Sequence, residues 1–269
     1  MMMSPLTDEQ YQQFHRDGYL IEKQLFSREE MQLLLKIGRA DLTMLRNAYD
    51  KVDATGSSTQ LSMRNELTED DIYSTIVCSR RLVDRLACLM NDEVYHWHHK
   101  MMLKEPRVGG AWEWHQDYGY WYRNNNVLYP DMASACIAID PATQANGCLQ
   151  LIQGSHKMGR IDHDITGTQI GADLNLVEAA LNHPDMTLVY AELDPGDVLF
   201  FHANTLHRSD ANTSEHPRWS LICCYNTKHN SPYKMHSGHP EYAPLNVVDD
   251  QSVLEVGNKH WQALEVVAS

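Results

Sequence analysis

Polar and apolar residues in the first 90 positions follow the pattern of amphipathic helices. Thr7 and Ser27 are each followed three residues later by Gln or Glu, which is the capping-box sequence of a helix start. The second helix has apolar residues at helical spacing, namely Met31, Leu34 and Leu35, continued by Leu42 and Leu45. The pattern also predicts a short strand at 18–21, a loop at 53–59 and a helix from Arg80 to Met90.

From about Val94 the pattern changes to short apolar runs separated by turn residues. These runs predict strands at Val94–Leu103, Ala133–Asp140, Cys148–Ile152, Met186–Leu193, Val198–His202 and Arg218–Asn226. Few helices interrupt them, although Leu174–Leu181 is expected to form one within a long connection. Such spacing is typical of an antiparallel sandwich or barrel.

The chain has no repeat, linker or low-complexity tract, so we expect one domain over residues 1–269. Residues 1–92 would form a mainly helical flank, and 93–230 the β core. The tail, 231–269, contains Pro232, Pro240 and Pro244 and is expected to be irregular and to wrap over the barrel.

Composition narrows the class of protein. The 269 residues carry a net charge of −14, which argues against nucleic acid or an anionic membrane as a general partner. The six cysteines show no C-x-x-C pair, as expected of reduced thiols. No apolar run approaches the roughly 20 residues of a membrane span, and Met1–Pro5 do not resemble a signal segment. We therefore expect a soluble, cytoplasmic protein.

Candidate metal ligands come from two distant parts of the chain. In Trp114-His115-Gln116-Asp117 the two ligands are two positions apart, so an extended chain directs both to one side. One His-x-Asp triplet is expected by chance in a chain with 15 histidines, so the triplet alone decides little. The turn and strand that precede His207 supply a third ligand. Two imidazoles and a carboxylate on one face of a metal are typical of non-haem iron(II) oxygenases.

Arg218 and Ser220 provide the second half of the predicted site. An α-keto acid can occupy two open positions of such an iron, and dioxygen the third. The far carboxylate of 2-oxoglutarate needs a cation, and arginine offers a bidentate fork. Ser220 is two residues further along a predicted strand and faces the same side. The alternative for Arg218 is a surface ion pair with Glu215.

Taken together, these motifs resemble the phytanoyl-CoA dioxygenase family of iron(II)/2-oxoglutarate oxygenases, from about Leu6 to Asn226. The resemblance also covers 146–149, 154–157 and 195–197. It implies a mainly β fold with flanking helices: a double-stranded β-helix, or cupin-like jelly roll, with N-terminal helices packed outside. It further implies that His115, Asp117 and His207 bind iron, and that Arg218 and Ser220 bind the C5 carboxylate of 2-oxoglutarate.

Further residues follow from the resemblance with less support. Met101 matches a position that lines the cosubstrate pocket, or is ordinary core, and Arg64 falls where some relatives place a basic residue near cosubstrate or substrate. Tyr118 and Trp121 are candidate substrate contacts at the start of a lid. Where many relatives carry Trp, this chain has Cys136, which leaves room near the cosubstrate. Relatives that halogenate lack the carboxylate ligand, so Asp117 favours hydroxylation.

The predicted function is hydroxylation of an unactivated C–H bond of a small metabolite, with Fe(II), 2-oxoglutarate and O2. The groups beside His115 suit a small polar or zwitterionic substrate better than a CoA ester. Two alternatives remain: a cupin-like metal dioxygenase that uses no keto acid, and a catalytically silent binding protein of the same fold. Loss of Arg218 would impair only the enzyme that uses 2-oxoglutarate.

Overall fold

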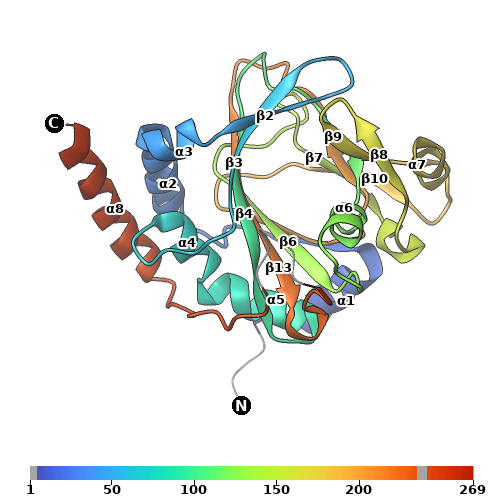
Figure 1. Cartoon of the computed structure of the whole chain (residues 1–269), viewed down its shortest axis with the longest axis horizontal. Coiled ribbons are helices and arrows are strands. Elements are labelled where there is room, and N and C mark those ends of the chain that lie inside the picture. Colours follow the sequence, from blue (N-terminus) through green and yellow to red (C-terminus); the bar gives the residue numbers. More distant parts are fainter. Residues whose placement is uncertain (1–4, 235–240, 269) are drawn as a thin grey trace.

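The structure is a computed structural model that describes residues 5–234 and 241–268. The first four residues and Pro240 lie outside the described residues. Two antiparallel sheets face each other, and most helices pack outside the larger sheet (Figure 1). No described helix is both long enough and apolar enough to cross a membrane.

The larger sheet has seven strands in the order β1-β11-β6-β13-β4-β3-β2. Their bounds are β1 Tyr19–Glu22, β2 Tyr49–Val52, β3 Ser58–Arg64, β4 Val94–Lys104, β6 Met132–Ala138, β11 Val198–His202 and β13 Arg218–Thr227. The smaller sheet has the order β10-β7-β12-β5, formed by β5 Trp112–His115, β7 Leu149–Gln153, β10 Thr187–Ala191 and β12 His207–Ser209. A separate hairpin consists of β8 His163–Thr166 and β9 Gln169–Ala172.

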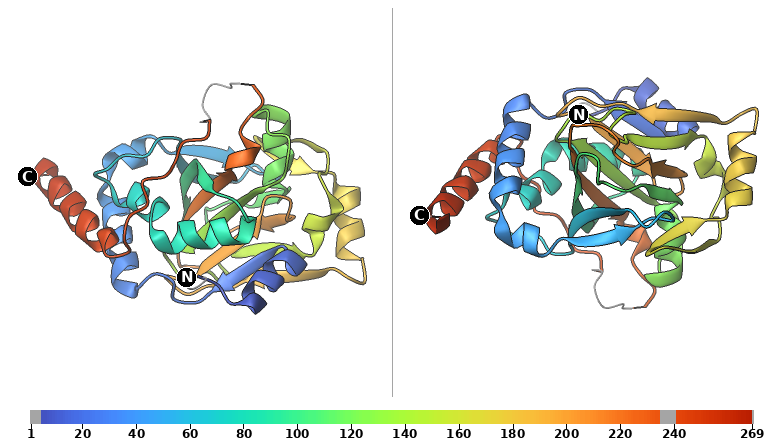
Figure 2. Two further views of the ribbon diagram at one scale, coloured as in Figure 1. Left: turned by 90° about the horizontal axis from the view of Figure 1, so that it is seen from below. Right: turned by 90° about the horizontal axis from the view of Figure 1, so that it is seen from above.

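The helices are α1 Asp8–Asp17, α2 Arg28–Ala40, α3 Leu42–Arg46, α4 Ile72–Val77, α5 Arg80–Met90, α6 Asp117–Asn124, α7 Leu174–Leu181 and α8 Ser252–Ala268. Both predicted capping boxes are present, with Thr7 and Ser27 as the N-caps of α1 and α2. The helix predictions at 80–90 and 174–181 are confirmed. In Figure 2 α8 lies beside α2, on the opposite side of the molecule from α7.

The seven-stranded sheet separates two apolar clusters. Side chains on its outer face pack against the helices, as Leu221 does with Leu34 and Ile76. Side chains on its inner face, such as Ile222 and Cys224, pack between the two sheets. The alternation along β13 therefore assigns every second residue to the helical side, and this decides which residues can reach a site between the sheets.

The six predicted strands are all present with small shifts of their ends, and the expected jelly-roll class agrees with this arrangement. Other predictions were wrong. Leu42 does not extend the apolar stripe of α2, because the helix ends at Ala40 and Leu42 is 59% exposed. The loop expected at 53–59 ends at Ser58, where β3 begins. The helical flank also supplies β1, β2 and β3 to the large sheet.

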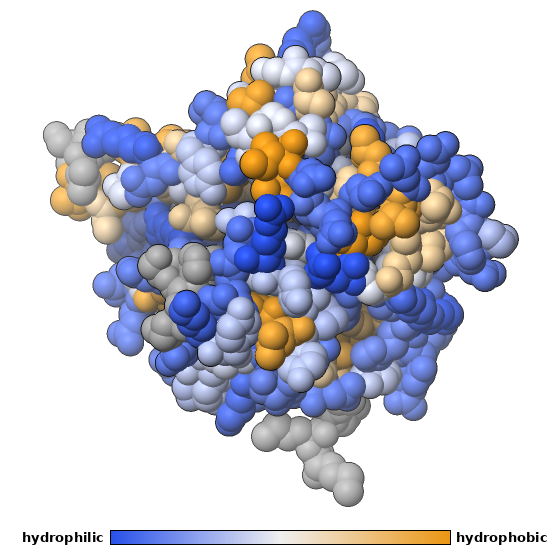
Figure 3. All heavy atoms as spheres, turned by 45° about the vertical axis from the view of Figure 1, so that its right-hand side comes forward, coloured by the Kyte–Doolittle hydropathy of each residue, from blue (hydrophilic) through white to orange (hydrophobic). Residues whose placement is uncertain are grey.

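The prediction for the tail was also wrong. Residues 252–268 form the 17-residue helix α8, which packs on α2 and α4 rather than over the barrel. On the other side of the molecule, hydrophobic patches are scattered among hydrophilic residues (Figure 3). Exposed apolar residues there include Ile165, Leu174 and Leu188, on β8, α7 and β10.

Candidate active site

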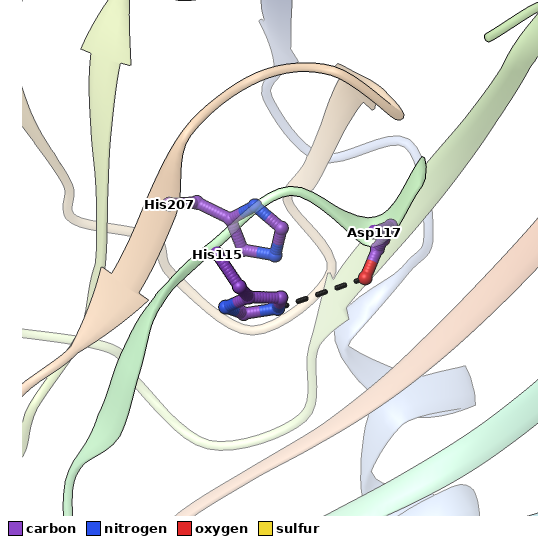
Figure 4. Close-up of side chains that lie close together, drawn as sticks. All are labelled: His115, Asp117 and His207. Carbon is purple, nitrogen blue, oxygen red and sulfur yellow. Dashed lines mark ion pairs between the residues drawn. The ribbon is translucent and has the colours of Figure 1, made fainter. Parts of the chain in front are cut away.

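The structure brings His115, Asp117 and His207 together between the sheets. His115 ends β5, Asp117 begins α6, and His207 begins β12 directly opposite His115 in the β5–β12 pair. One ligand atom from each residue lies within 4.8 Å of the others, and His115 Nε2 is 3.6 Å from Asp117 Oδ1 (Figure 4). The junction of strand and helix therefore replaces the extended segment expected at 115–117, with the same convergence.

Hydrogen bonds fix the orientation of all three side chains. Nδ1 of His115 lies 2.8 Å from the carbonyl of Glu113, and Nδ1 of His207 lies 2.9 Å from that of Thr205. A carbonyl only accepts, so both Nδ1 atoms carry the proton and both Nε2 atoms present a lone pair. Asp117 Oδ2 accepts a hydrogen bond of 3.2 Å from Ser134 Oγ.

The protonation states also suit a metal. Burial, with a smaller effect of His115, lowers the pKa of His207 to about 3, so this imidazole is neutral near pH 7. Burial alone would raise the pKa of Asp117. The adjacent imidazole of His115 and the positive charge of Lys100 act against burial, and that pKa lies well below its ordinary value. Neutral imidazoles and an ionised carboxylate are the forms that bind a divalent cation.

A cavity of about 160 Å³ opens beside these ligands. Its walls are largely aromatic, from Tyr49, Trp112, Tyr120 and Trp121. Trp121 thus lies where a substrate contact was predicted. Tyr118 is not among the residues that line this cavity, and its hydroxyl donates to the carbonyl of Leu128. Both residues are 3% exposed and belong to the same apolar cluster, but because 117–124 is a helix only Trp121 reaches the cavity.

Arg218 and Ser220 face the space between the sheets, as expected, and are 4% and 3% exposed. With Cys136 they line a second, smaller cavity. Nε of Arg218 and Oγ of Ser220 are buried without a hydrogen-bond partner among the described residues. Burial raises the pKa of the Cys136 thiol, while Arg218 and Ser220 beside it act in the opposite direction. The ion pair with Glu215 does not form, because Glu215 pairs with Arg107.

Arg218 is therefore a buried cation without a paired carboxylate in the described part of the chain. Burial lowers its pKa. Its direct partner across the β13–β4 pair is Lys104, which is also buried and donates to Ser209 Oγ at 2.8 Å. Burial and the charge of Arg218 lower the pKa of Lys104. A buried guanidinium and an unsatisfied hydroxyl facing one small cavity fit a carboxylate ligand. The residues present thus fit both an iron ion and the distal carboxylate of 2-oxoglutarate.

Two predicted cosubstrate residues lie on the wrong face of the sheet. Met101 belongs to the helix-side core, near Gly38 of α2. Arg64 points to the same side and pairs with Asp41 and Asp71 at 3.4 and 3.3 Å. Both predictions are wrong because neighbouring residues of a strand face opposite sides of the sheet, and each of these residues was assigned to the wrong side.

The structure places three further residues at the site; sequence reasoning missed Lys100 and Ser134, and it considered His163 only as a residue near the site entrance. Lys100 lines the cavity, and burial would lower its pKa, but the charge of Asp117 raises it. Ser134 holds Asp117. His163 Nε2 accepts a 2.8 Å hydrogen bond from the backbone N–H of Gln116, between the two early ligands. A lysine inside the apolar strand 94–104 was the one signal available from the sequence.

Comparisons with known proteins agree with this geometry. The sequence profile of the family Phytanoyl-CoA dioxygenase (PhyH) matches residues 14–220. The chain is 26% identical to an L-proline trans-4-hydroxylase of Streptomyces griseoviridis, over 93% of this chain and 95% of that one. It is also 26% identical to an ectoine dioxygenase of Sphingopyxis alaskensis, over 84% of this chain and 78% of the relative.

A solved structure confirms the fold. EctD from S. alaskensis with 2-oxoglutarate and 5-hydroxyectoine superposes with a TM-score of 0.75 at 21% identity, covering 93% of this chain and 89% of that chain. The jelly-roll prediction and the predicted family are both confirmed. The chain belongs to the phytanoyl-CoA dioxygenase family and is a non-haem iron dioxygenase that uses 2-oxoglutarate.

Proposed function

We propose that this protein hydroxylates a C–H bond of a small, amino-acid-like metabolite while 2-oxoglutarate is decarboxylated to succinate. His115, Asp117 and His207 hold the iron(II), and Arg218 with Ser220 binds the C5 carboxylate of 2-oxoglutarate. One observation supports these roles above all others: three metal ligands converge, and Arg218 and Ser220, each with a buried unsatisfied polar atom, line a second small cavity on the inner face of the large sheet.

Iron(II) with 2-oxoglutarate supplies the activation of dioxygen, the oxidative decarboxylation of the keto acid and the removal of hydrogen from the substrate. The protein's own groups arrange this chemistry. The two carbonyl-bound imidazoles present Nε2 to the metal, and Ser134 holds the second oxygen of Asp117. The aromatic side chains of the cavity offer apolar surface beside the reacting C–H bond.

The size and lining of the cavity support a small substrate. A cavity of about 160 Å³ with aromatic and polar side chains in its wall suits a small molecule, and the net charge of −14 offers no general attraction for the phosphates of a CoA ester. The curated relatives named above act on proline and ectoine. A compact, polar metabolite is the substrate class that fits both observations.

Anaerobic addition of iron(II) and 2-oxoglutarate to the purified protein tests the proposal. A visible charge-transfer band is expected, and it should be absent in His115→Ala and Asp117→Ala. Succinate release should then increase when the correct metabolite is added in air. A protein that binds iron but develops no band with 2-oxoglutarate, and whose turnover ignores this keto acid, would contradict the proposed function.

We also propose that the chain forms one domain and acts in the cytoplasm. The helices and the large sheet share a continuous apolar cluster, which supports a single folding unit. None of the six cysteines, all of which the structure describes, is in a disulfide, as is usual in a reducing compartment.

A further inference from the structure

Two hairpins meet at the mouth of the cavity. The segment after β2 contacts the turn between β8 and β9 through paired hydrogen bonds: Val52 N donates to Thr168 Oγ1 at 2.7 Å, and Thr168 N donates to Val52 O at 3.1 Å. Gly167, with φ +62°, makes this approach possible, because a Cβ there would lie 2.4 Å from the Val52 carbonyl. The contact fixes β2 at the rim of the cavity.

Lys51 is held at this rim. It lines the cavity, and its Nζ donates to the carbonyl of Thr168 at 3.1 Å, across the junction of the two hairpins. An ammonium group has three donors, so this bond leaves two N–H groups for a ligand. The ammonium also lies 5.9 Å from the ring of Tyr49, on the same face of β2.

The charges around the cavity are unusual for an acidic protein. The chain has 36 acidic and 22 basic residues, yet the described residues that line this cavity include two lysines and no acidic side chain except Asp117. With iron(II) and 2-oxoglutarate bound, Asp117 and the cosubstrate bring three negative charges. Iron, Arg218 and Lys100 bring four positive ones. Lys51 adds to this surplus, so a substrate anion would be attracted.

We propose that Lys51 binds a carboxylate of the substrate and thereby selects carboxylate-bearing metabolites. This inference rests on the proposed function and specifies its substrate class. A cationic substrate without a carboxylate would face Lys51 and Lys100, and the ring of Trp112 already has Lys100 at 5.8 Å. In a zwitterion, the carboxylate can pair with Lys51 while the ammonium lies over the exposed ring of Tyr120.

Calorimetry under anaerobic conditions tests the role of Lys51. Protein loaded with iron(II) and 2-oxoglutarate is titrated with three carboxylates, namely L-proline, ectoine and L-valine, and with L-prolinamide, in which the carboxylate is replaced. At least one carboxylate should bind, and prolinamide should bind at least about 10-fold more weakly than proline. Lys51→Met should weaken the best carboxylate about 10- to 100-fold, as expected for loss of a charge-assisted hydrogen bond.

Matched variants separate this role from a structural one. Lys51→Arg should retain most of the affinity. Lys157→Met removes an equal charge from an exposed position away from the cavity and should change nothing. The proposal is overturned if none of the three carboxylates binds, if prolinamide binds as tightly as proline, or if Lys51→Met leaves carboxylate affinity unchanged. The charge-transfer band distinguishes the failures: a missing band contradicts the proposed function, whereas a normal band with these results contradicts only the role of Lys51.

Discussion

At the scale of single residues, Arg218 shows that a residue placed for ligand binding can lower the stability of the ligand-free fold. A buried cation without a paired carboxylate destabilises the ligand-free protein, because its desolvation is not compensated. We expect Arg218→Met to raise the free energy of unfolding by about 1–3 kcal/mol and to raise the Kd of 2-oxoglutarate at least 100-fold. Urea unfolding and titration of the charge-transfer band measure the two quantities.

Arg107→Met is the matched control for this prediction, since Arg107 is an exposed arginine paired with Glu215. It should change neither quantity appreciably. Loss of 2-oxoglutarate binding together with loss of stability would show that Arg218 is structural instead.

Ser134 is the residue that positions Asp117. It is fully buried, and its hydroxyl donates to Asp117 Oδ2. Removing such a support typically weakens metal binding about 10- to 100-fold, so Ser134→Ala should lower iron(II) affinity by that factor in a competition assay. Ser220→Ala is the contrasting variant: it should weaken 2-oxoglutarate and leave iron affinity unchanged. Equal effects of both variants on iron would refute the separate roles.

The residues of the site could be predicted from the sequence where the chemistry of their side chains is enough to identify them. Such side chains have few other uses in an apolar interior: His115, Asp117 and His207 converge as expected, and Arg218 and Ser220 are buried on the inner face of the large sheet. Met101 and Arg64 were misassigned because the face of a strand depends on register, and Tyr118 because 117–124 is helical. Lys51 was missed since a lysine on a short polar strand has no distinguishing signal in the sequence.

At the scale of elements, the turn before β11 holds β1 on the edge of the large sheet. Asp197 is fully buried and accepts hydrogen bonds from Lys23 Nζ, Gln24 N and Asp194 N at 2.7–2.9 Å. Burial alone would raise the pKa of Asp197, but these donors together lower it. Asp197→Asn should therefore reduce the free energy of unfolding by about 3 kcal/mol at pH 7.

The pH dependence of that loss follows from linkage. A carboxyl with a lowered folded pKa stabilises the fold above its unfolded value of 3.8, and this stabilisation disappears as the pH falls through the folded value. The difference between wild type and Asp197→Asn in urea unfolding should be full at pH 7 and shrink below about pH 4. A difference independent of pH would exclude the charge as the cause.

Elements with a strong local pattern could be predicted, and the others could not. Strands buried on both faces, such as β4 and β13, are long apolar runs. By contrast, β2, β8 and β9 are short and polar, and only their pairing makes them strands. The helix α8 was missed because the prolines before it suggested an irregular tail, whereas its own residues Val253, Trp261 and Leu264 pack on the helical layer.

At the scale of the whole molecule, stability and catalysis lie on opposite faces of one sheet. Trp261 of α8 packs at the edge of the helix-side core, and Lys36 of α2 lies 3.7 Å from its ring centre. Trp261→Ala should lower the free energy of unfolding by about 1–3 kcal/mol while the Kd of 2-oxoglutarate changes less than twofold. Gln262→Ala, at the exposed neighbouring position, should be neutral. A large change in cosubstrate affinity would show that α8 acts on the site.

Only the class of the fold, and not the order of strands in its sheets, could be predicted from the sequence. The switch from helical to strand spacing near Val94 indicates helices outside a β sandwich, as found. The sequence carries no signal for the addition of β1, β2 and β3 to the larger sheet, because their pairing partners are distant in the chain and set by tertiary contacts.

The edge strand β2 contributes no residue to either apolar cluster of the large sheet, although Tyr49 and Lys51 line the cavity. Mutations in β2 should consequently disturb the packing of the apolar clusters little. New specificities can arise by changing this rim while the oxidative machinery beneath it stays untouched. Substitutions that change specificity should therefore be tolerated best on β2, both in natural relatives and in laboratory libraries.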